Sequence, residues 1–284
     1  MLIVSVRTLS LKGIVMSDSK QQDAAQDVAT REKLRLIKRN FGAVAAAYVT
    51  SKVHANGQDL AWIVEAAALN GSECVLDIAT GGGHVAFALA PYAAEIVALD
   101  LTREMLQVAQ QEAIQRQLST ISFLEGDARQ LPCADASFDV VVCRQAAHHF
   151  PQIQQCVQEW ARILKPGGKL LVDDTISPAE PQTDALLHEI EILRDPSHVR
   201  SQSLSDWNRL LREAGFEVQS EREWGIVLDI PTWTQRMRTP VASVESIEQL
   251  LRDASPTDRE ILHIEEQDGV FTFALPALLI TATK

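Results

Sequence analysis

A run of three glycines directly after an apolar segment is the feature of this 284-residue chain whose residue types most clearly predict chemistry. Residues 75–84 read VLDIATGGGH, in which Gly81, Gly82 and Gly83 form a turn ahead of a helical pattern. Glycines let the backbone approach a ligand closely, and the start of a helix favours a negatively charged group. Residues 81–86 also satisfy the dinucleotide fingerprint GxGxxA, so the turn alone fits nicotinamide dinucleotides and other adenosine-containing cofactors equally well.

The next apolar segment ends at Asp100, seventeen residues after Gly83. A carboxylate at this place can accept hydrogen bonds from both hydroxyl groups of a ribose, which all these cofactors share. The alternative role is a cap for the helix that follows, which Thr102 would fill equally well. Asp100 is therefore a predicted ribose ligand that does not discriminate between the cofactors.

Short apolar segments separated by helical patterns must position these residues. The segments are apolar throughout, as expected for buried parallel strands, and each connection is long enough for a right-handed crossover. They cover residues 74–78, 96–99, 121–124, 140–143 and 170–172, and two last strands are expected at 216–218 and 278–283.

Helical patterns lie before, between and after these strands. The first helix is expected to begin near residue 31, and a second covers residues 60–69 and stops at Asn70-Gly71. A capped helix is expected at residues 203–214. Residues 178–202, which contain three prolines, and the mostly helical residues 226–266 interrupt the alternation, so both are predicted to be insertions over the site.

Three further motifs separate the possible cofactors. They follow the glycine turn at residues 126–132 (GDARQLP), 135–141 (DASFDVV) and 164–170 (LKPGGKL). In these motifs the sequence resembles the class I methyltransferases that use S-adenosylmethionine, particularly the subgroup related to the ubiquinone and menaquinone biosynthesis methyltransferases. The resemblance covers residues 73–175 well, and it implies a Rossmann-like fold with a mixed seven-stranded sheet whose last strand is antiparallel.

The resemblance also implies a role for each matching position. Residues 77–84 would wrap the methionine part of the cofactor, Asp100 would hold the ribose, and Asp127 with Ala128 would face the adenine. The Asp127 carboxylate can accept from the exocyclic amino group, although a loop-capping role is the alternative. The expected cofactor residues are Asp77, Thr80, Gly81, Gly82, Gly83, Asp100, Leu101, Met105, Gly126, Asp127, Ala128, Arg144, Phe41 and Tyr48.

The common turn of the family is GxGTG, whereas Gly82 carries no hydroxyl, which leaves Thr80 as the candidate to supply one. Upstream, Phe41-Gly42, Tyr48, Ser51 and His54 resemble the amino-terminal helix that closes over the cofactor in this subgroup. Packing of Phe41 and Tyr48 on the apolar face of that helix is an alternative of equal weight.

A histidine pair follows the fourth strand, in residues 144–150 (RQAAHHF). Methyl transfer to a protonated nucleophile needs in-line positioning and a base, and an imidazole suits the second role. The hypothesis is that His149, or else His148, accepts the proton, with His198 of the first insertion as a second candidate. Shaping of the pocket without base catalysis stays open, and metal binding is disfavoured because adjacent ligands rarely converge.

The insertions offer residues that could select an acceptor. Arg194 and Arg200 could bind a carboxylate or a phenolate, with simple solvation as the alternative. Trp224 and Trp233 could line an aromatic pocket, whereas Trp207 fits core packing better.

Composition narrows the partners. A formal net charge of −12 argues against nucleic acid, because phosphate binding needs a clustered cationic face. The four cysteines show no zinc spacing, which predicts reduced thiols and a cytoplasmic protein. No segment approaches the roughly 20 apolar residues that span a bilayer. A homodimer, and Met16 as an alternative start, are both compatible with the sequence.

The sequence therefore predicts an α/β, doubly wound methyltransferase domain at residues 31–284, after a mobile tail at 1–30. Within it, residues 31–70 form a helical cap, 73–177 the cofactor-binding half, and 178–202 and 226–266 the lid insertions. The expected reaction moves the methyl group of S-adenosylmethionine to a small molecule, with oxygen or carbon preferred over nitrogen. The alternatives are an NAD(P)-dependent oxidoreductase, disfavoured because no Tyr-x-x-x-Lys pair is present, and a protein that binds S-adenosylmethionine without turnover.

Overall fold

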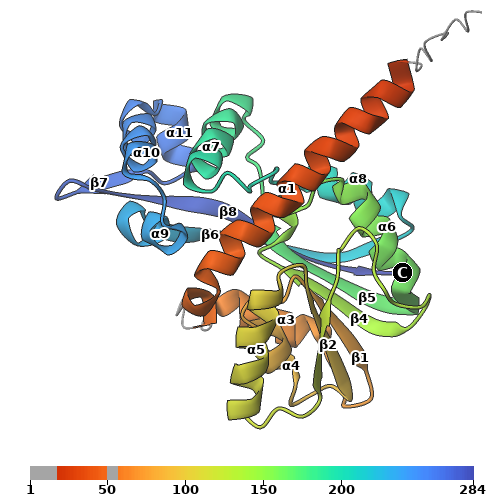
Figure 1. The fold of residues 1–284 in the computed structure, drawn as a ribbon. Helices are drawn as coiled ribbons and strands as arrows, with labels where there is room; N and C mark the ends of the chain where they lie inside the picture. Colours follow the sequence, from red (N-terminus) through yellow and green to blue (C-terminus); the bar gives the residue numbers. More distant parts are fainter. Residues whose placement is uncertain (1–17, 50–56) are drawn as a thin grey trace, which may run out of the picture.

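A mixed eight-stranded sheet with helices on both faces forms the body of the protein (Figure 1). The computed structural model describes residues 18–49 and 57–284, and the side chains of residues 27–45 and 57–284. The main strand order is β3-β2-β1-β4-β5-β8-β6, and β7 pairs only with β8. The strands are β1 (Cys74–Ile78), β2 (Glu95–Asp100), β3 (Ile121–Glu125), β4 (Phe138–Arg144), β5 (Leu164–Thr175), β6 (Glu217–Asp229), β7 (Glu265–Gln267) and β8 (Val270–Thr283).

The first five strands are parallel, as their uniformly apolar sequences predict. Helices α3 (Gln58–Ala67), α4 (His84–Leu89) and α5 (Arg103–Gln115) cover one face of the sheet, and α6 (Ile153–Ile163) and α8 (Leu204–Glu213) cover the other (Figure 1). Trp160 and Trp207 anchor the core of the second face, where each is almost fully buried. Core packing of Trp207, expected from the sequence, is therefore confirmed.

The doubly wound α/β fold with an antiparallel last strand is confirmed, and the predicted strand number is corrected from seven to eight. Strand β8 runs antiparallel between β5 and β6. The additional strand β7 joins β8 through Asp268 and Gly269, whose φ values are +52° and +78°. Both values suit a tight hairpin turn, for which an Asp-Gly pair is a typical signal.

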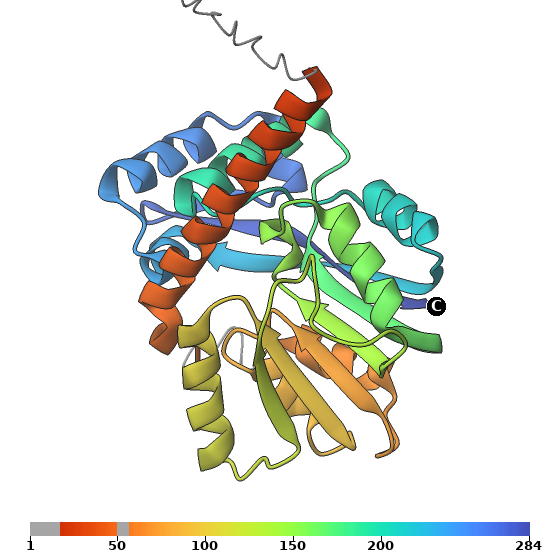
Figure 2. The same ribbon diagram turned by 45° about the vertical axis from the view of Figure 1, so that its right-hand side comes forward.

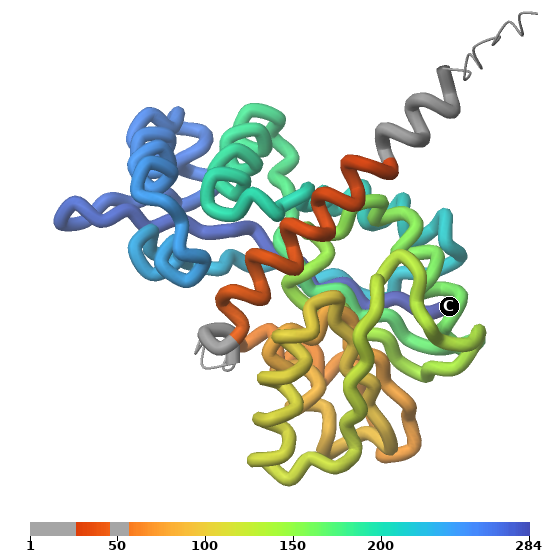
Figure 3. Tube along the Cα trace, viewed as in Figure 1, coloured from red at the N-terminus to blue at the C-terminus, as the bar shows by residue number. Residues whose placement is uncertain are grey.

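Strands β6 and β8 are much longer than the sequence predicted. Their outer halves extend beyond the other strands and carry α9 (Ile230–Met237), α10 (Val241–Asp253) and α11 (Pro256–Ile261), as Figure 3 shows. Helix α7 (Pro181–Arg194) packs in the same place. These elements share a second core that includes Ile190, Trp233, Leu251 and Phe273. The two insertions that the sequence predicted separately are therefore one helical subdomain.

Helix α1 (Asp18–Val49) crosses the molecule diagonally in front of this subdomain and contacts α5 as well as α9 (Figure 2). It begins well before residue 31, the start predicted from the sequence. Its first turns consist of polar residues without an apolar stripe, which is why the sequence pattern did not reveal them. In its described part, Ile37, Val44 and Ala45 are buried. Helix α3 ends at the left-handed Ala68, before the predicted stop at Gly71. No helix in the described ranges is long and apolar enough to cross a membrane.

Candidate functional site

The glycine turn joins β1 to α4 at the carboxyl edge of the sheet. Gly81 and Gly83 have φ values of +53° and +86°, and a Cβ at Gly83 would lie 2.4 Å from the ring of Phe87. Only glycine fits such a backbone without strain. The buried carboxylate of Asp77 braces the turn, because its Oδ2 accepts from Thr80 Oγ1 at 2.6 Å and from the N–H of Ala86 at 3.2 Å. Burial raises the pKa of Asp77 to about 7.

Asp100 ties the end of β2 to the same turn. Its Oδ2 accepts from the N–H of Gly81 at 2.9 Å, and its Oδ1 accepts from the N–H of Thr102 at 2.8 Å. Burial raises the pKa of Asp100. Thr102 is the N-cap of α5, so Asp100 is not the helix cap that the sequence left as an alternative. Each carboxylate oxygen keeps a lone pair for a further donor, as a ribose diol requires.

Two adjoining cavities at this edge are lined by most of the expected cofactor residues, and we call them the first and second cofactor cavities. The first has the glycine turn on one side and Ile37 and Phe41 of α1 on the other. The second has the loop after β3, and both cavities contact Ile37, His149 and Phe150. Of the expected set, the cavities are lined by Phe41, Asp77, Thr80, Gly81, Gly82, Asp100, Leu101, Met105, Gly126, Asp127, Ala128 and Arg144. Gly83 shapes the turn behind them, and the side chain of Tyr48, with Ser51 and His54, lies outside the described residues.

Asp127 lines the second of these cavities and is also hydrogen-bonded to Arg129. Arg129 donates to it through Nε at 3.1 Å and Nη2 at 2.6 Å, and the N–H of Arg129 donates to Oδ1 at 3.0 Å. Burial on its own raises the pKa of Asp127, but these hydrogen bonds outweigh it and the pKa lies below its ordinary value. Asp127 thus caps its loop, as the alternative predicted, while its position beside the cavity is retained.

Helix α1 is fastened over the cofactor cavities by contacts with the loop after α7. Lys33 Nζ donates to the carbonyl oxygens of Pro196 at 2.9 Å and of His198 at 3.0 Å. Asn40 Nδ2 donates to Asp195 Oδ1 at 3.0 Å. These hydrogen bonds hold α1 where it closes one side of the cavities.

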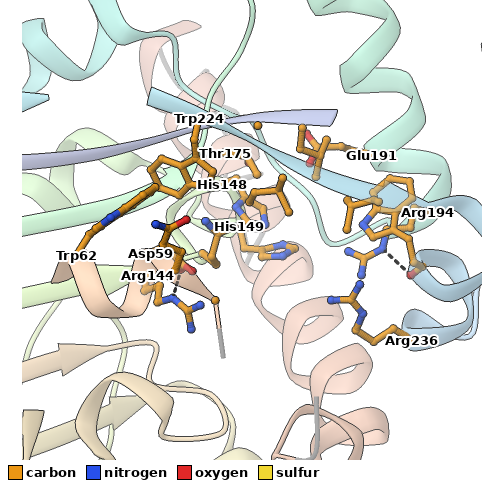
Figure 4. A pocket seen from close by; sticks show the side chains of 18 of the residues that line it. Asp59, Trp62, Arg144, His148, His149, Thr175, Glu191, Arg194, Trp224 and Arg236 are labelled. Carbon is orange, nitrogen blue, oxygen red and sulfur yellow. Dashed lines mark hydrogen bonds and ion pairs between the residues drawn. The ribbon is translucent and has the colours of Figure 1, made fainter. Parts of the chain in front are cut away.

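A larger cavity, of about 400 Å³, lies between the sheet and the helical subdomain. Figure 4 shows aromatic side chains, three arginines and two histidines around it. It shares Phe41, Arg144, Gln145 and His149 with the first cofactor cavity. A molecule in the larger cavity would therefore lie directly beside a molecule held by the glycine turn.

His148 lies in the wall of the larger cavity and is held by a carboxylate at the end of β5. Its Nδ1 lies 2.5 Å from Asp174 Oδ1, and its backbone N–H donates to Asp174 Oδ2 at 2.8 Å. Burial on its own lowers the pKa of His148, but the charge of Asp174 and this hydrogen bond outweigh it, so the pKa is raised. Asp174 was not among the expected site residues.

His149 is buried next to His148, with the ring centroids 4.3 Å apart. The edge of its ring meets Phe41, at a centroid distance of 4.9 Å, and its Nδ1 lies 3.3 Å from Ser197 Oγ. Burial, with the neighbouring charge of His148, lowers the pKa of His149 to about 3. An imidazole with so low a pKa is a weak base, so the directions of the two pKa shifts favour His148 over His149 as the base.

His198 is not among the residues that line these three cavities. Its Nε2 lies 3.5 Å from Glu191 Oε2, and burial lowers its pKa. The loop that carries it instead fixes His148, because the N–H groups of Val199 and Arg200 donate to the carbonyl oxygen of His148 at 2.9 and 3.0 Å. The structure therefore supports His198 as packing behind the site and not as a group that reaches an acceptor.

Arg144 lines both the larger cavity and the first cofactor cavity. Its Nε donates to Asp59 Oδ2 at 2.5 Å, and Asp59 comes from the first turn of α3. Asp59 and Trp62 both line the larger cavity, and neither is among the residues predicted for the site. An acidic residue and an aromatic residue in the first turns of a helix are a weak sequence signal for a binding site. Only the packing of α3 places them in the cavity wall.

The residues expected to select an acceptor divide into two groups. Arg194, Trp224 and Trp233 line the larger cavity. Arg200 instead forms an ion pair with Asp184 outside it. In the described part of the chain, no group of three or more His, Cys, Asp or Glu residues could hold a metal ion.

Nuclear magnetic resonance should separate the two adjacent histidines. His148 is expected to titrate with a pKa above the ordinary imidazole value of about 6.5, because Asp174 stabilises its charged form. His149 should stay neutral between about pH 5 and 9, since its pKa is lowered to about 3. Ring-carbon proton shifts recorded across this range test both statements, and titration of His149 near neutral pH would contradict the second.

Known proteins share this combination of fold and motifs. A profile described as a methyltransferase domain matches residues 76–172, which include the glycine turn. YcgJ of Bacillus subtilis, described as an uncharacterized methyltransferase, is 36% identical over 246 residues, which cover 86% of this chain and 97% of YcgJ. This chain belongs to the family of S-adenosylmethionine-dependent methyltransferases. The nicotinamide alternative is therefore set aside.

The similarity of this methyltransferase to YcgJ extends to the structure. The crystal structure of YcgJ superposes with a TM-score of 0.78 at 34% identity, covering 80% of this chain and 98% of YcgJ. The demethylmenaquinone methyltransferase of Deinococcus radiodurans is 38% identical over 155 residues, 52% of this chain and 64% of that protein. The 27-O-demethylrifamycin SV methyltransferase of Amycolatopsis mediterranei is 31% identical over 174 residues, 59% of this chain and 62% of that protein.

The residues of this methyltransferase fit S-adenosylmethionine. Asp100 has the lone pairs for a ribose diol, and Asp127 has those for an exocyclic amino group, each at the edge of its cavity. Position 81 has a positive φ, and a Cβ there would meet only the carbonyl oxygen of Ala79, at 4.0 Å. The backbone at Gly81 is therefore open to a ligand in the cavity.

Proposed function

We propose that this methyltransferase methylates an oxygen or carbon atom of a small molecule bound in the 400 Å³ cavity, with His148 accepting the proton of the acceptor. One observation carries the proposal. His148, which is paired with Asp174, lies in the wall of this cavity, and the same cavity adjoins the one beside the glycine turn. Bound S-adenosylmethionine supplies an electrophilic methyl group on its sulfonium.

The chain's own residues perform the remaining tasks. Neutral His148 takes the proton through its Nε2, since its Nδ1 is occupied by Asp174. The Asp174 carboxylate then stabilises the imidazolium, in the manner of the carboxylate in a catalytic triad. Helix α1 excludes water from one side of the reacting atoms, because Phe41 lines both adjoining cavities. Arg144, paired with Asp59, holds the β4 end of the shared wall in place.

The choice of oxygen or carbon rests on two supports. A base is needed for the hydroxyl of a phenol or alcohol and for an acidic carbon, and His148 provides one. The names of the Deinococcus and Amycolatopsis relatives refer to small-molecule acceptors, one of them methylated at oxygen. A cytoplasmic location remains a proposal that the free thiols support, and a homodimer remains a prediction.

A methyl-transfer screen tests the proposed function. The protein is incubated with S-adenosylmethionine labelled in its methyl group and a panel of quinols, phenols and polyketide-like hydroxyl compounds. The expected result is one S-adenosylhomocysteine per methylated acceptor, with mass spectrometry locating the added group. Binding of S-adenosylmethionine without transfer to any member of the panel would favour the alternative of a binding protein without turnover.

A further inference from the structure

The larger cavity carries an excess of positive charge in a protein of net charge −12. Three arginines line it, Arg144, Arg194 and Arg236, together with the carboxylates of Asp59 and Glu191. Arg144 is balanced by Asp59 at 2.5 Å. The Oε2 of Glu191 accepts from Ser201 Oγ at 3.2 Å and lies 3.5 Å from His198 Nε2, so its direct contacts are with these two residues and not with an arginine.

Arg194 is held in the wall by contacts with Trp233 and not by a direct ion pair. Its guanidinium carbon lies 4.8 Å from the centroid of the Trp233 ring, and its Nε donates to the carbonyl oxygen of Trp233 at a long 3.4 Å. Among the described residues, no carboxylate lies within 4 Å of this guanidinium. Stacking on an aromatic ring fixes the plane of an arginine fork while its terminal nitrogens stay available to an anion.

Arg236 comes from α9, the helix that also supplies Trp233. Figure 4 shows the guanidinium groups of Arg194 and Arg236 on the same side of the cavity. Trp62 and Trp224 stand on the opposite side, in an edge-to-face pair with centroids 5.2 Å apart. The cavity thus has an aromatic wall at one end and two arginine forks at the other.

We propose that the acceptor of this methyltransferase is an aromatic carboxylic acid, whose ring packs against Trp62 and Trp224 and whose carboxylate binds Arg194 and Arg236. The proposal rests on the proposed function, because it takes this cavity as the acceptor site. Planar guanidinium groups bind carboxylates through paired hydrogen bonds, which give direction as well as affinity. The two arginines would place the ring of the acceptor between themselves and the tryptophan pair, with His148 in the wall beside it.

Calorimetry with two probes of equal shape tests the proposal. The intact protein is saturated with S-adenosylhomocysteine and titrated with a hydroxynaphthoate or with the neutral hydroxynaphthamide of the same substitution. The wild type should bind the acid about tenfold or more tightly than the amide. Arg194→Gln and Arg236→Gln should each lose most of this preference, whereas Arg238→Gln, two residues further along the chain and exposed, should keep it.

Three results would overturn the proposal. They are equal affinity for the acid and the amide, a preference that survives both cavity variants, and no measurable binding of either probe up to about millimolar concentration. Because the readout involves no methyl transfer, it is separable from the proposed function. An acid preference that persists in His148→Gln, together with lost transfer, would support both. An acid preference without any transfer in the wild type would overturn the proposed function, and with it the role of the acid as acceptor, while the two arginines would still be the carboxylate site.

Discussion

Asp100→Ala is expected to lower the affinity for S-adenosylhomocysteine by about two orders of magnitude or more. Hydrogen bonds to a charged group contribute about 1.5–3 kcal/mol each, and the ribose diol offers two donors to this carboxylate. The substitution also removes the acceptor for the N–H groups of Gly81 and Thr102, which lie 2.9 and 2.8 Å from the carboxylate oxygens. The glycine turn would lose the group that sets its distance from β2.

Calorimetric titration measures this effect, with two controls. Asp135→Ala removes an exposed carboxylate that pairs with Arg162, so the affinity for S-adenosylhomocysteine should stay unchanged. Asp100→Asn keeps the shape of the side chain and should fall between the wild type and the alanine variant. Wild-type affinity in Asp100→Ala would mean that the ribose is held elsewhere.

His148→Gln is expected to lower kcat by about 10²–10⁴-fold, the usual contribution of a positioned general base. Glutamine retains much of the side chain's volume but has no basic nitrogen to take the proton of the acceptor. The affinity for S-adenosylhomocysteine should change little, because His148 lines the acceptor cavity and not the cofactor cavities.

His149→Gln serves as the matched comparison on the neighbouring residue. His149 has a pKa lowered to about 3, so its loss should affect the shape of the shared wall more than proton transfer. We expect a smaller fall in kcat, accompanied by a change in KM or cofactor affinity, since His149 lines all three cavities. A larger fall in kcat for His149→Gln than for His148→Gln would return the base to His149.

The cofactor half of the site could be predicted because its residues lie in short contiguous motifs. A glycine turn after an apolar segment, and an acidic residue at the end of the next one, depend only on local backbone geometry and on the common edge of parallel strands. Asp77, Gly81, Asp100 and Asp127 therefore lie where the sequence placed them, at the cofactor cavities.

The acceptor half depends on pairings that no local pattern contains. Asp174 reaches His148 because β4 pairs with β5 in a register that sets Arg144 opposite Asp173. The apolar segment that predicts this strand ends at Val172, so the prediction does not include the two carboxylates that follow. His198 was selected as a histidine in an insertion, but the loop turns its side chain toward Glu191.

The helical subdomain was recognised only in part, for a related reason. The outer halves of β6 and β8 lie beyond the parallel strands, and their inward residues pack against helices instead of a continuing sheet. Leu228 and Phe273 are buried in the second core, whereas Val227, which directly precedes Leu228 on β6, is exposed. The helices that cover this core determine which strand residues face it. Those helices come from two separate insertions, so no local pattern in the strands predicts the burial.

The pH dependence of methyl transfer, measured for the wild type and for Asp174→Asn, tests the proposed base most directly. A base acts when neutral, so kcat/KM should fall as the pH drops through the pKa of His148, which Asp174 raises above the ordinary value of about 6.5. Asp174→Asn removes that charge, so the fall should move to lower pH and the maximal rate should decrease. A profile whose acid limb stays at the same pH in both proteins would contradict His148 as the base.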